Sequence, residues 1–339
     1  MYHGSFQIEN QLMTNTSPKI SMLIWTYNRA DQVEISIRSV LNQTFEDFEL
    51  ILVDNGSTDH TPAVLEKYCN HPKVRLFRLE ENRRVTGGMN FALDQMHGEW
   101  FATLGDHDEI VPHAFETLLQ VVEEVDPSID AVTANAISST TGEFCGLGLD
   151  KDQYLPLETI VSKVSGDFFG IAKTTLLGDK RLNEKLLGNE NSFWYKIDSI
   201  ANRYYIHQGL KIFNTEEGDS FTKELKSMDF SIKSGMYKEL INEPFFWEVT
   251  NKYNRKRSVA LGLRGYFFSK IHGYQKGLQF YKRMMRGGSA KYQILATILK
   301  LSPGVLLEWG YRLMASTWLG HKVSQLLVKP FGEIKQNRH

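Results

Sequence analysis

The sequence predicts an α/β fold in which helices cover both faces of a mostly parallel central sheet, with a helical appendage at the C-terminus. Two observations support this prediction. Short apolar runs alternate with helical patterns along residues 18–220, and connections this short join parallel strands through helices. From about Phe221 to Leu327 the pattern is mostly helical instead, with interruptions at Gly287-Gly288 and Pro303-Gly304.

The elements follow from the local patterns. Runs rich in apolar residues predict strands at Ile20–Trp25, Phe48–Val53, Val74–Leu79, Trp100–Leu104 and Asp130–Asn135. Helical spacing or start signals predict helices over Val33–Leu41, from near Thr61, and at Gly87–Met96, Ala114–Glu124 and Ser192–Asn202. Residues 136–180 are mixed and contain glycines, so their elements are not assigned. Ligands of such sheets bind beyond the carboxyl ends of the strands, which makes the residues after each strand the candidates for function.

The composition fits a globular protein in a reducing compartment. Of the 339 residues, 42% are hydrophobic and 23% are charged, which is enough to bury a sizeable core. The two cysteines, Cys69 and Cys145, are far apart and lack metal-site spacing, so neither a disulfide framework nor a zinc site is indicated. Residues 1–17 lack a basic start followed by an apolar run, so we expect a flexible lead-in, no secretion signal and a cytoplasmic catalytic domain.

The charge is divided unevenly along the chain. Residues 251–339 contain 17 Lys and Arg against two acids, a net charge of +15, so residues 1–250 carry −16. Aromatic residues among the basic ones favour peripheral attachment to an anionic membrane surface at its inner face, and no nucleic-acid-binding signature accompanies the charge. Charges interrupt Ile294–Leu319, which disfavours a spanning helix. The alternative is an appendage whose apolar face packs on protein.

Two carboxylates follow the predicted fourth strand directly. Asp106 and Asp108 are one residue apart, so a loop can turn both towards one point. Mn²⁺ or Mg²⁺ prefers such oxygen ligands and commonly completes its coordination shell with substrate phosphates. This indicates a nucleoside diphosphate as the substrate. The alternative, a solvated acidic turn, is common for an isolated pair of this kind.

Polar residues also follow the second and third predicted strands. The Asp54 carboxylate could accept a hydrogen bond from the ring N–H of uracil, thymine or guanine, or could bind a ribose hydroxyl. The alternative is an Asx-turn that starts the Asn55-Gly56 loop. Asn82-Arg83-Arg84 precedes Thr86-Gly87-Gly88, which places cationic side chains and free N–H groups where phosphate could bind, although an ordinary helix start has the same pattern.

Four ordered segments resemble the family 2 glycosyltransferases. They are TYNR at 26–29, SVLNQTFEDFELILVDNGSTD at 39–59, EN at 81–82 with GGMNFAL at 87–93, and LGDHDEIVPHAF at 104–115. The resemblance implies a Rossmann-like glycosyltransferase A fold over residues 18–220, with residues 221–339 as the basic helical C-terminal region. It implies inverting transfer of a sugar from a nucleoside diphosphate-sugar, most simply a UDP-sugar, to a hydroxyl of a glycan or lipid-linked acceptor, in surface glycan or polysaccharide synthesis.

The resemblance also implies roles for particular residues. The expected nucleotide contacts are Thr26, Tyr27, Asn28, Arg29, Asp54, Arg83, Gly87 and Asp106. The expected metal ligands are Asp106, Asp108 and Glu217, and the expected catalytic base is Glu190, which takes the proton of the acceptor hydroxyl. Glu190 could instead be a first-turn glutamate favoured by the helix dipole.

Several residues depart from the family pattern. Trp25 stands where proline is usual, and Asn55 replaces the second acid of the usual pair, changes expected to tune nucleotide contacts. Asn191 replaces the acid that usually follows the base. These departures leave open a non-catalytic protein that binds a nucleotide-sugar on a degenerate scaffold. A dinucleotide-dependent dehydrogenase is disfavoured because no glycine follows the first strand at Thr26–Ala30.

Overall fold

The computed structural model describes residues 5–7, 17–186, 190–214, 230–286, 289–304 and 306–307, and the chain divides into two compact units. Unit 1 comprises Met1–Glu184 and Lys196–Thr215. Unit 2 comprises Lys185–Tyr195 and Glu216–His339. The predicted border at residue 220 lies outside the described residues.

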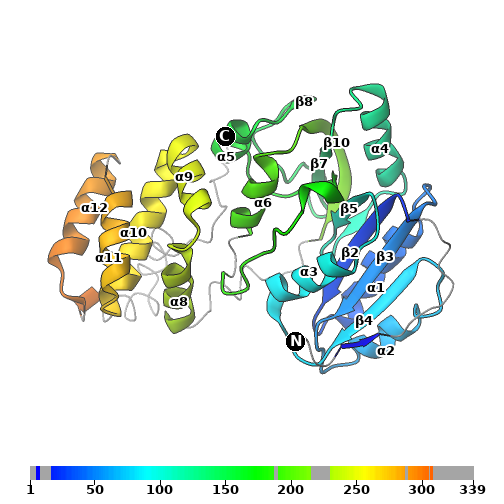
Figure 1. Ribbon diagram of the computed structural model, residues 1–339, viewed down its shortest axis with the longest axis horizontal. Helices are drawn as coiled ribbons and strands as arrows, with labels where there is room; N and C mark the ends of the chain where they lie inside the picture. The colour runs from blue at the N-terminus through cyan, green and yellow to red at the C-terminus, as the bar shows by residue number, and fades with distance from the viewer. Residues whose placement is uncertain are drawn as a thin grey trace. The chain divides into compact units, whose positions relative to one another are not determined.

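Unit 1 is built on a mixed sheet with the strand order β1-β4-β3-β2-β5-β9-β7-β10-β6, and β8 pairs with β10 (Figure 1). Its strands are β1 (Ser5–Gln7), β2 (Ile20–Thr26), β3 (Phe48–Asp54), β4 (Val74–Leu79), β5 (Trp100–Thr103), β6 (Glu109–Ile110), β7 (Ala131–Ser138), β8 (Gln153–Tyr154), β9 (Phe168–Lys173) and β10 (Arg203–Phe213). β1 lies within the predicted lead-in and pairs antiparallel with β4.

The strand directions confirm the predicted fold class. β4, β3, β2 and β5 pair in parallel, as do β7 and β10. β9 runs antiparallel between β5 and β7, so the two parallel groups point the same way. The carboxyl ends of β2, β3, β5 and β10 therefore face one edge of the sheet, where the candidate residues follow the strands.

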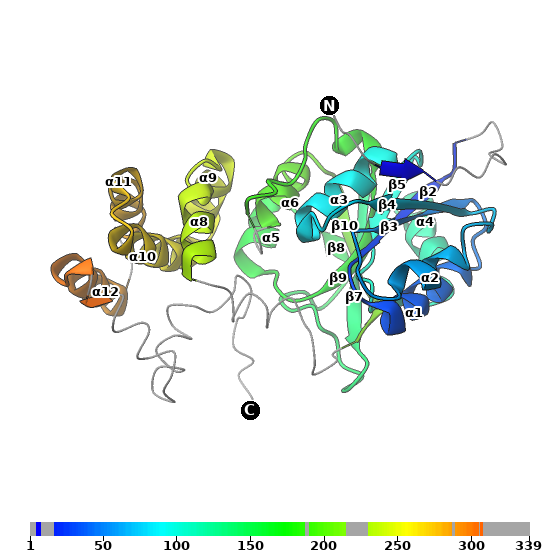
Figure 2. The same ribbon diagram turned by 90° about the horizontal axis from the view of Figure 1, so that it is seen from below.

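Helices cover both faces of this sheet (Figure 2). α1 (Ala30–Leu41), α2 (Thr61–Glu66) and α4 (Ala114–Glu124) lie on one face, and α3 (Arg84–Gln95) lies on the other. α5 (Leu157–Lys163), the 3₁₀ turn Thr174–Leu176 and α6 (Asn191–Asp198) occupy sequence between the later strands. The predicted helix at 87–96 begins one turn earlier, at Arg84.

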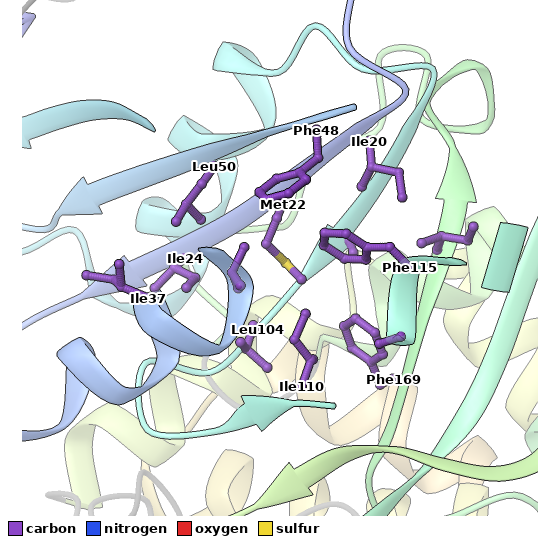
Figure 3. Close-up of a cluster of buried hydrophobic side chains, with 14 of the residues drawn as sticks. Ile20, Met22, Ile24, Ile37, Phe48, Leu50, Leu104, Ile110, Phe115 and Phe169 are labelled. Atoms are coloured by element: carbon purple, nitrogen blue, oxygen red, sulfur yellow. The ribbon is translucent and has the colours of Figure 1, made fainter. Parts of the chain in front are cut away.

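The main core lies between the sheet and the α1 face (Figure 3). Alternate residues of β2 point into it, among them Ile20 and Met22, which are fully buried. Phe48 of β3 meets Phe115 of α4 edge to face, with ring centroids 5.3 Å apart. Each such side chain contributes about 1.5–3 kcal/mol by leaving water, so this layer fixes the strands whose ends carry the site.

β6, β8, β9 and β10 were not predicted. β10 shows why, because its pairing with β7 shifts register on both sides of Gly209. An irregularity of this kind breaks the two-residue alternation that marks a strand in a sequence. His207 and Lys211 interrupt the apolar pattern further.

Unit 2 confirms the predicted helical appendage. Its helices are α8 (Phe230–Leu240), α9 (Pro244–Tyr253), α10 (Arg255–Ile271), α11 (Gln275–Met284) and α12 (Ala290–Leu301). Aromatic rings fill its interior, where Tyr237 stacks on Phe268 with centroids 5.0 Å apart and Trp247 Nε1 donates to Leu240 O. Among the described residues, no helix has the length and apolar character needed to cross a membrane.

Candidate active site

The loop after β2 is fastened to the loop after β3. Asn28 has a left-handed backbone (φ 52°), which asparagine tolerates better than most residues. Its Oδ1 accepts from the Thr58 N–H at 2.8 Å, and its own N–H donates to Ser57 Oγ at 3.0 Å. The Arg29 N–H donates to Thr61 Oγ1 at 2.9 Å. The structure therefore holds Thr26–Arg29 against the loop that follows Asp54, while the Tyr27 side chain remains exposed.

One carboxylate oxygen of Asp54 accepts a hydrogen bond, and the other has none. The residue is 1% exposed, and its Oδ1 accepts from the Ser57 N–H at 2.9 Å, three residues on, one residue beyond the Asx-turn considered from the sequence. Its Oδ2 is buried without a hydrogen bond, although Arg78 Nε lies 3.3 Å away and attracts it electrostatically. Thr26, its register partner on β2, also has a buried Oγ1 without a hydrogen bond. Two neighbouring buried oxygens of this kind call for a partner, because each unmet one costs free energy.

Glycine at position 56 is required by this loop. Gly56 has φ 77°, and a Cβ there would lie 2.5 Å from the carbonyl carbon of Glu81. Only glycine combines that backbone conformation with so close an approach. The loop after Asp54 is thereby pressed against the segment that leads into α3.

Asn55 connects these segments as a structural residue. It is 2% exposed, its Nδ2 donates to Arg84 O at 2.9 Å and to Asn82 Oδ1 at 3.2 Å, and its Oδ1 accepts from the Arg83 N–H. From the sequence, asparagine in place of the usual acid was expected to tune nucleotide contacts. In the structure the amide of this residue bridges the end of β3 to the start of α3.

We expect Asn55→Asp to destabilise the protein by about 1–3 kcal/mol, because a carboxylate cannot donate to Arg84 O or Asn82 Oδ1. Urea unfolding should show a lower midpoint. Asn70→Asp, at an exposed position, is the matched control and should unfold like the parent. An unchanged midpoint for Asn55→Asp would show that the amide does not carry this connection.

Several groups at the start of α3 are bonded within the protein, although Thr86 Oγ1 is buried without a hydrogen bond. The N–H groups of Arg83 and Arg84 donate to Asn55 Oδ1 and Asn82 Oδ1. Arg83 Nη2 lies 2.7 Å from Glu184 Oε1. A Cβ on Gly87 would lie 2.5 Å from Arg83 Cβ, so glycine permits this packing. A phosphate at this helix start would have to compete with these bonds.

The Asp106-His107-Asp108 turn follows β5 and is held by α1, because Ser36 Oγ donates to Gly105 O at 3.2 Å. Arg29 Nε lies 3.9 Å from Asp106 Oδ1, so the structure brings together two residues predicted to bind nucleotide. His107 Nδ1 lies 3.2 Å from the same oxygen. The hydrogen bond to Asp106 raises the pKa of His107, while burial opposes that shift.

Asp108 is buried in an ion-pair cluster that the sequence did not predict. Lys211 Nζ, from β10, donates to Asp108 Oδ2 at 3.0 Å and to Asp167 Oδ1 at 2.8 Å. The Asn214 N–H donates to the other Asp108 oxygen at 3.1 Å. Burial alone would lower the pKa of Lys211, but Asp167 and Asp108 outweigh it and raise that pKa, which keeps the ammonium charged. The one feature of the sequence that points to this cluster is a lysine placed between two apolar residues, Leu210 and Ile212.

The fit of a divalent cation differs among the three expected ligands. Asp106 fits, because its carboxylate is partly exposed. Asp108 as placed does not, because both its oxygens are bonded and one faces an ammonium. Glu217 lies outside the described residues, and within those residues no group of three His, Cys, Asp or Glu side chains is arranged to hold a metal. The described donors alone therefore do not make a metal site.

Glu190 is described within unit 2, where it directly precedes α6. Its carbonyl oxygen accepts from the N–H groups of Phe193 and Trp194 at 2.9 and 3.0 Å, so it forms the N-terminal boundary of that helix. α6 is anchored within the unit through Tyr195, which stacks on Phe246 and whose hydroxyl accepts from Arg257 Nη1 at 2.8 Å. The predicted base thus stands at a helix start on a well-packed support.

The fold and these residues can now be compared with known proteins. The profile of "Glycosyl transferase family 2" matches residues 21–158. The GalNAc(5)-diNAcBac-PP-undecaprenol β-1,3-glucosyltransferase of Campylobacter jejuni is 30% identical over 303 residues, covering 86% of this chain and 96% of that protein. The chain belongs to glycosyltransferase family 2. It is therefore an enzyme of glycan biosynthesis that acts on nucleotide sugars.

Solved structures support the fold of this transferase. Residues 1–349 of Staphylococcus aureus TarS, in complex with UDP-GlcNAc, superpose with a TM-score of 0.60 at 18% identity, covering 87% of this chain and 92% of that one. The mannosyltransferase PcManGT of Pyrobaculum calidifontis, in complex with GDP-Man and Mn²⁺, superposes with a TM-score of 0.51 at 14% identity, covering 92% of this chain and 85% of that one. At these identities the likeness concerns the fold, which confirms the expected glycosyltransferase A architecture.

Proposed function

We propose that this family 2 glycosyltransferase moves a sugar from a UDP-sugar to a hydroxyl of a lipid-linked glycan, with inversion at the anomeric carbon. The observation that carries the donor assignment is the buried Oδ2 of Asp54, which has an ion pair to Arg78 but no hydrogen bond, beside the Oγ1 of Thr26, which also has no hydrogen bond. Uracil, thymine and guanine present a ring N–H next to a carbonyl oxygen, so the carboxylate can accept and the hydroxyl can donate, whereas cytosine and adenine lack that N–H. Among these bases we choose uracil because TarS, which shares the fold, is described in complex with UDP-GlcNAc. The Campylobacter jejuni relative matches this chain over 96% of its own length. It is named for transfer to a polyprenyl diphosphate-linked glycan, which supports the acceptor class.

The charges around Asp106 suit the diphosphate end of that donor. Arg29 and His107 both lie near Asp106 Oδ1, where the guanidinium would place positive charge beside the phosphate oxygens and the imidazole offers a ring N–H donor. The Asp106 carboxylate would accept a hydrogen bond from a ribose hydroxyl. Lys211 neutralises Asp108, so this second carboxylate does not repel the anionic substrate.

In the reaction that we propose, the acceptor oxygen attacks the anomeric carbon while the bond from that carbon to the diphosphate oxygen breaks. UDP leaves with the bonding electrons, and the acceptor proton passes to the Glu190 carboxylate.

The donor assignment is tested by thermal unfolding of the protein with UDP, GDP, TDP and CDP. A ligand that binds only the native state raises the unfolding temperature. UDP should give the largest shift, and CDP, which lacks the ring N–H, should give the smallest. Equal shifts with all four nucleotides would remove the role given to Asp54.

Asp54→Asn should weaken UDP binding by about tenfold to a hundredfold, because a charged acceptor is lost while Oδ1 still accepts from Ser57. Isothermal titration calorimetry measures this change. Arg78→Gln is the control, since it removes the ion pair to Oδ2 and leaves the acceptor in place. If both variants bind UDP more weakly than the parent and to the same extent, the loss comes from the ion pair and the proposed contact with the base is excluded.

Mn²⁺ or Mg²⁺ stays part of the proposal, as the resemblance implies, with Asp106 as its ligand among the described residues. The same thermal series with Mn²⁺ or with EDTA tests it. A shift by UDP that needs Mn²⁺, and that Asp106→Asn abolishes, would support the cation. A full shift in EDTA would show that nucleotide binding does not need the divalent cation.

A further inference from the structure

Within unit 2, helix α12 presents apolar residues on two opposite faces. Ala296 and Leu299 are buried, and α12 packs against α10 through this side. Lys270 of α10 reinforces the contact, because its Nζ donates to the carbonyl oxygens of Leu299 and Lys300 at the C-terminal end of α12. The helix is therefore fixed to the unit by one face.

The other face of α12 carries large aliphatic side chains that the described structure leaves in solvent. Ile294, Ile298 and Leu301 are 62%, 52% and 79% exposed. Their spacing of four and three residues aligns them on one side of the helix, opposite Ala296 and Leu299. Leu306, which is 61% exposed, follows shortly after the helix. This row, Ile294, Ile298, Leu301 and Leu306, is called the aliphatic row below.

The sequence around the aliphatic row is strongly basic. Residues 251–307 contain twelve Lys and Arg and no Asp or Glu. Lys291 and Lys300 are exposed on α12 itself. The other exposed basic residues of this stretch are Lys252, Lys256, Lys276, Lys282, Arg283 and Arg286. The described acids from residue 230 onward, Glu239, Glu243 and Glu248, lie on or beside α8 and α9, so the charged side chains of α10, α11 and α12 are all basic and this charge pattern favours an anionic partner.

We propose that the aliphatic row inserts into the interfacial region of an anionic lipid bilayer while the surrounding lysines and arginines bind its headgroups. Charge complementarity selects this occupant, because a second copy of the same face would bring like charges together. An apolar helix face beside basic residues is the pattern of helices that lie in the membrane interface. This role extends the proposed function and does not depend on the donor or base assigned above.

The test is sedimentation of the full chain with sucrose-loaded vesicles of phosphatidylglycerol and phosphatidylcholine. The triple variant Ile294→Ser, Ile298→Ser and Leu301→Ser should bind at least about tenfold more weakly than the parent. The double variant Ile35→Ser and Ile200→Ser is the matched control, because these isoleucines are 44% and 56% exposed in unit 1. It should sediment like the parent.

The binding of the headgroups by basic side chains is tested separately. Lys291→Gln with Lys300→Gln should weaken binding by on the order of thirtyfold at low salt, at about 1 kcal/mol per charge, and by much less at high salt. Pure phosphatidylcholine vesicles should bind the parent weakly.

Two results would overturn the proposal. One is undiminished sedimentation of the triple variant. The other is a triple variant that changes from dimer to monomer in light scattering and still binds vesicles, which would assign the aliphatic row to a second copy. Unchanged thermal shifts by UDP in each variant show that the fold is intact, and they keep a failure here separate from a failure of the donor assignment.

Discussion

Glu190→Gln is expected to lower turnover by about 10²- to 10⁴-fold while UDP binding stays unchanged, because glutamine cannot take the proton of the acceptor hydroxyl. The glutamate precedes α6 and supports the helix through its backbone carbonyl, which the substitution leaves in place. The measurement is release of UDP with a saturating acceptor, alongside calorimetric titration of UDP. Loss of turnover with unchanged nucleotide affinity is the pattern of a residue needed only in the chemical step.

Glu158→Gln is the matched control, since Glu158 is an exposed glutamate in the first turn of α5. A role limited to the helix dipole would make the two substitutions equivalent, each worth about 0.3–1 kcal/mol of stability with no loss of turnover. Equal activities would therefore move the catalytic base to another residue. A parent protein that binds UDP and shows no turnover with any lipid-linked glycan would favour the non-catalytic alternative.

Lys211→Met is expected to destabilise unit 1 by about 3–5 kcal/mol, because it leaves Asp108 buried without its cation. Methionine keeps much of the side-chain volume, so the loss reports mainly on the ammonium. The transition in urea should move to lower concentration, and nucleotide binding should fall as the Asp106 turn loses its support. Lys151→Met, at an exposed position, should change neither quantity.

A double variant distinguishes charge from packing. Lys211→Met combined with Asp108→Asn removes both partners and should be more stable than Lys211→Met alone, because the buried carboxylate at position 108 is gone and the remaining one, Asp167, is partly exposed to solvent. If the double variant loses the sum of the two single effects, the ion pair contributes nothing of its own. The packing of β10 would then explain the loss.

The first half of the sheet could be predicted closely because local patterns determine it. β2, β3 and β4 are short apolar runs bounded by turn formers, and their ends fell within one residue of the predicted ones. β10 was missed because its register shifts at Gly209, so its side chains do not alternate regularly. β9 pairs antiparallel between strands that are distant in sequence, and no local pattern encodes that choice.

The candidate site shows the same division. Asp54, Asp106 and Asp108 were found because each follows a strand directly. Lys211 was not found, because its relation to Asp108 depends on β10 lying beside β6. Asn55 was noticed only as a missing acid. Its role appeared in the structure, where the segment leading into α3 takes both amide N–H donors and one bond to the amide oxygen.

The pairing of Lys211 with Asp108 also sets an order of events on the ribosome. The two residues are 103 positions apart. At synthesis rates of about 5–20 residues per second, the acidic turn emerges about 5–20 s before its cation. During that interval β2 to β5 can pair, yet the Asp108 carboxylate must stay hydrated. The nascent transferase therefore closes its acidic turn only after β10 has been made, and a chain cut short before residue 211 would keep that turn open to water.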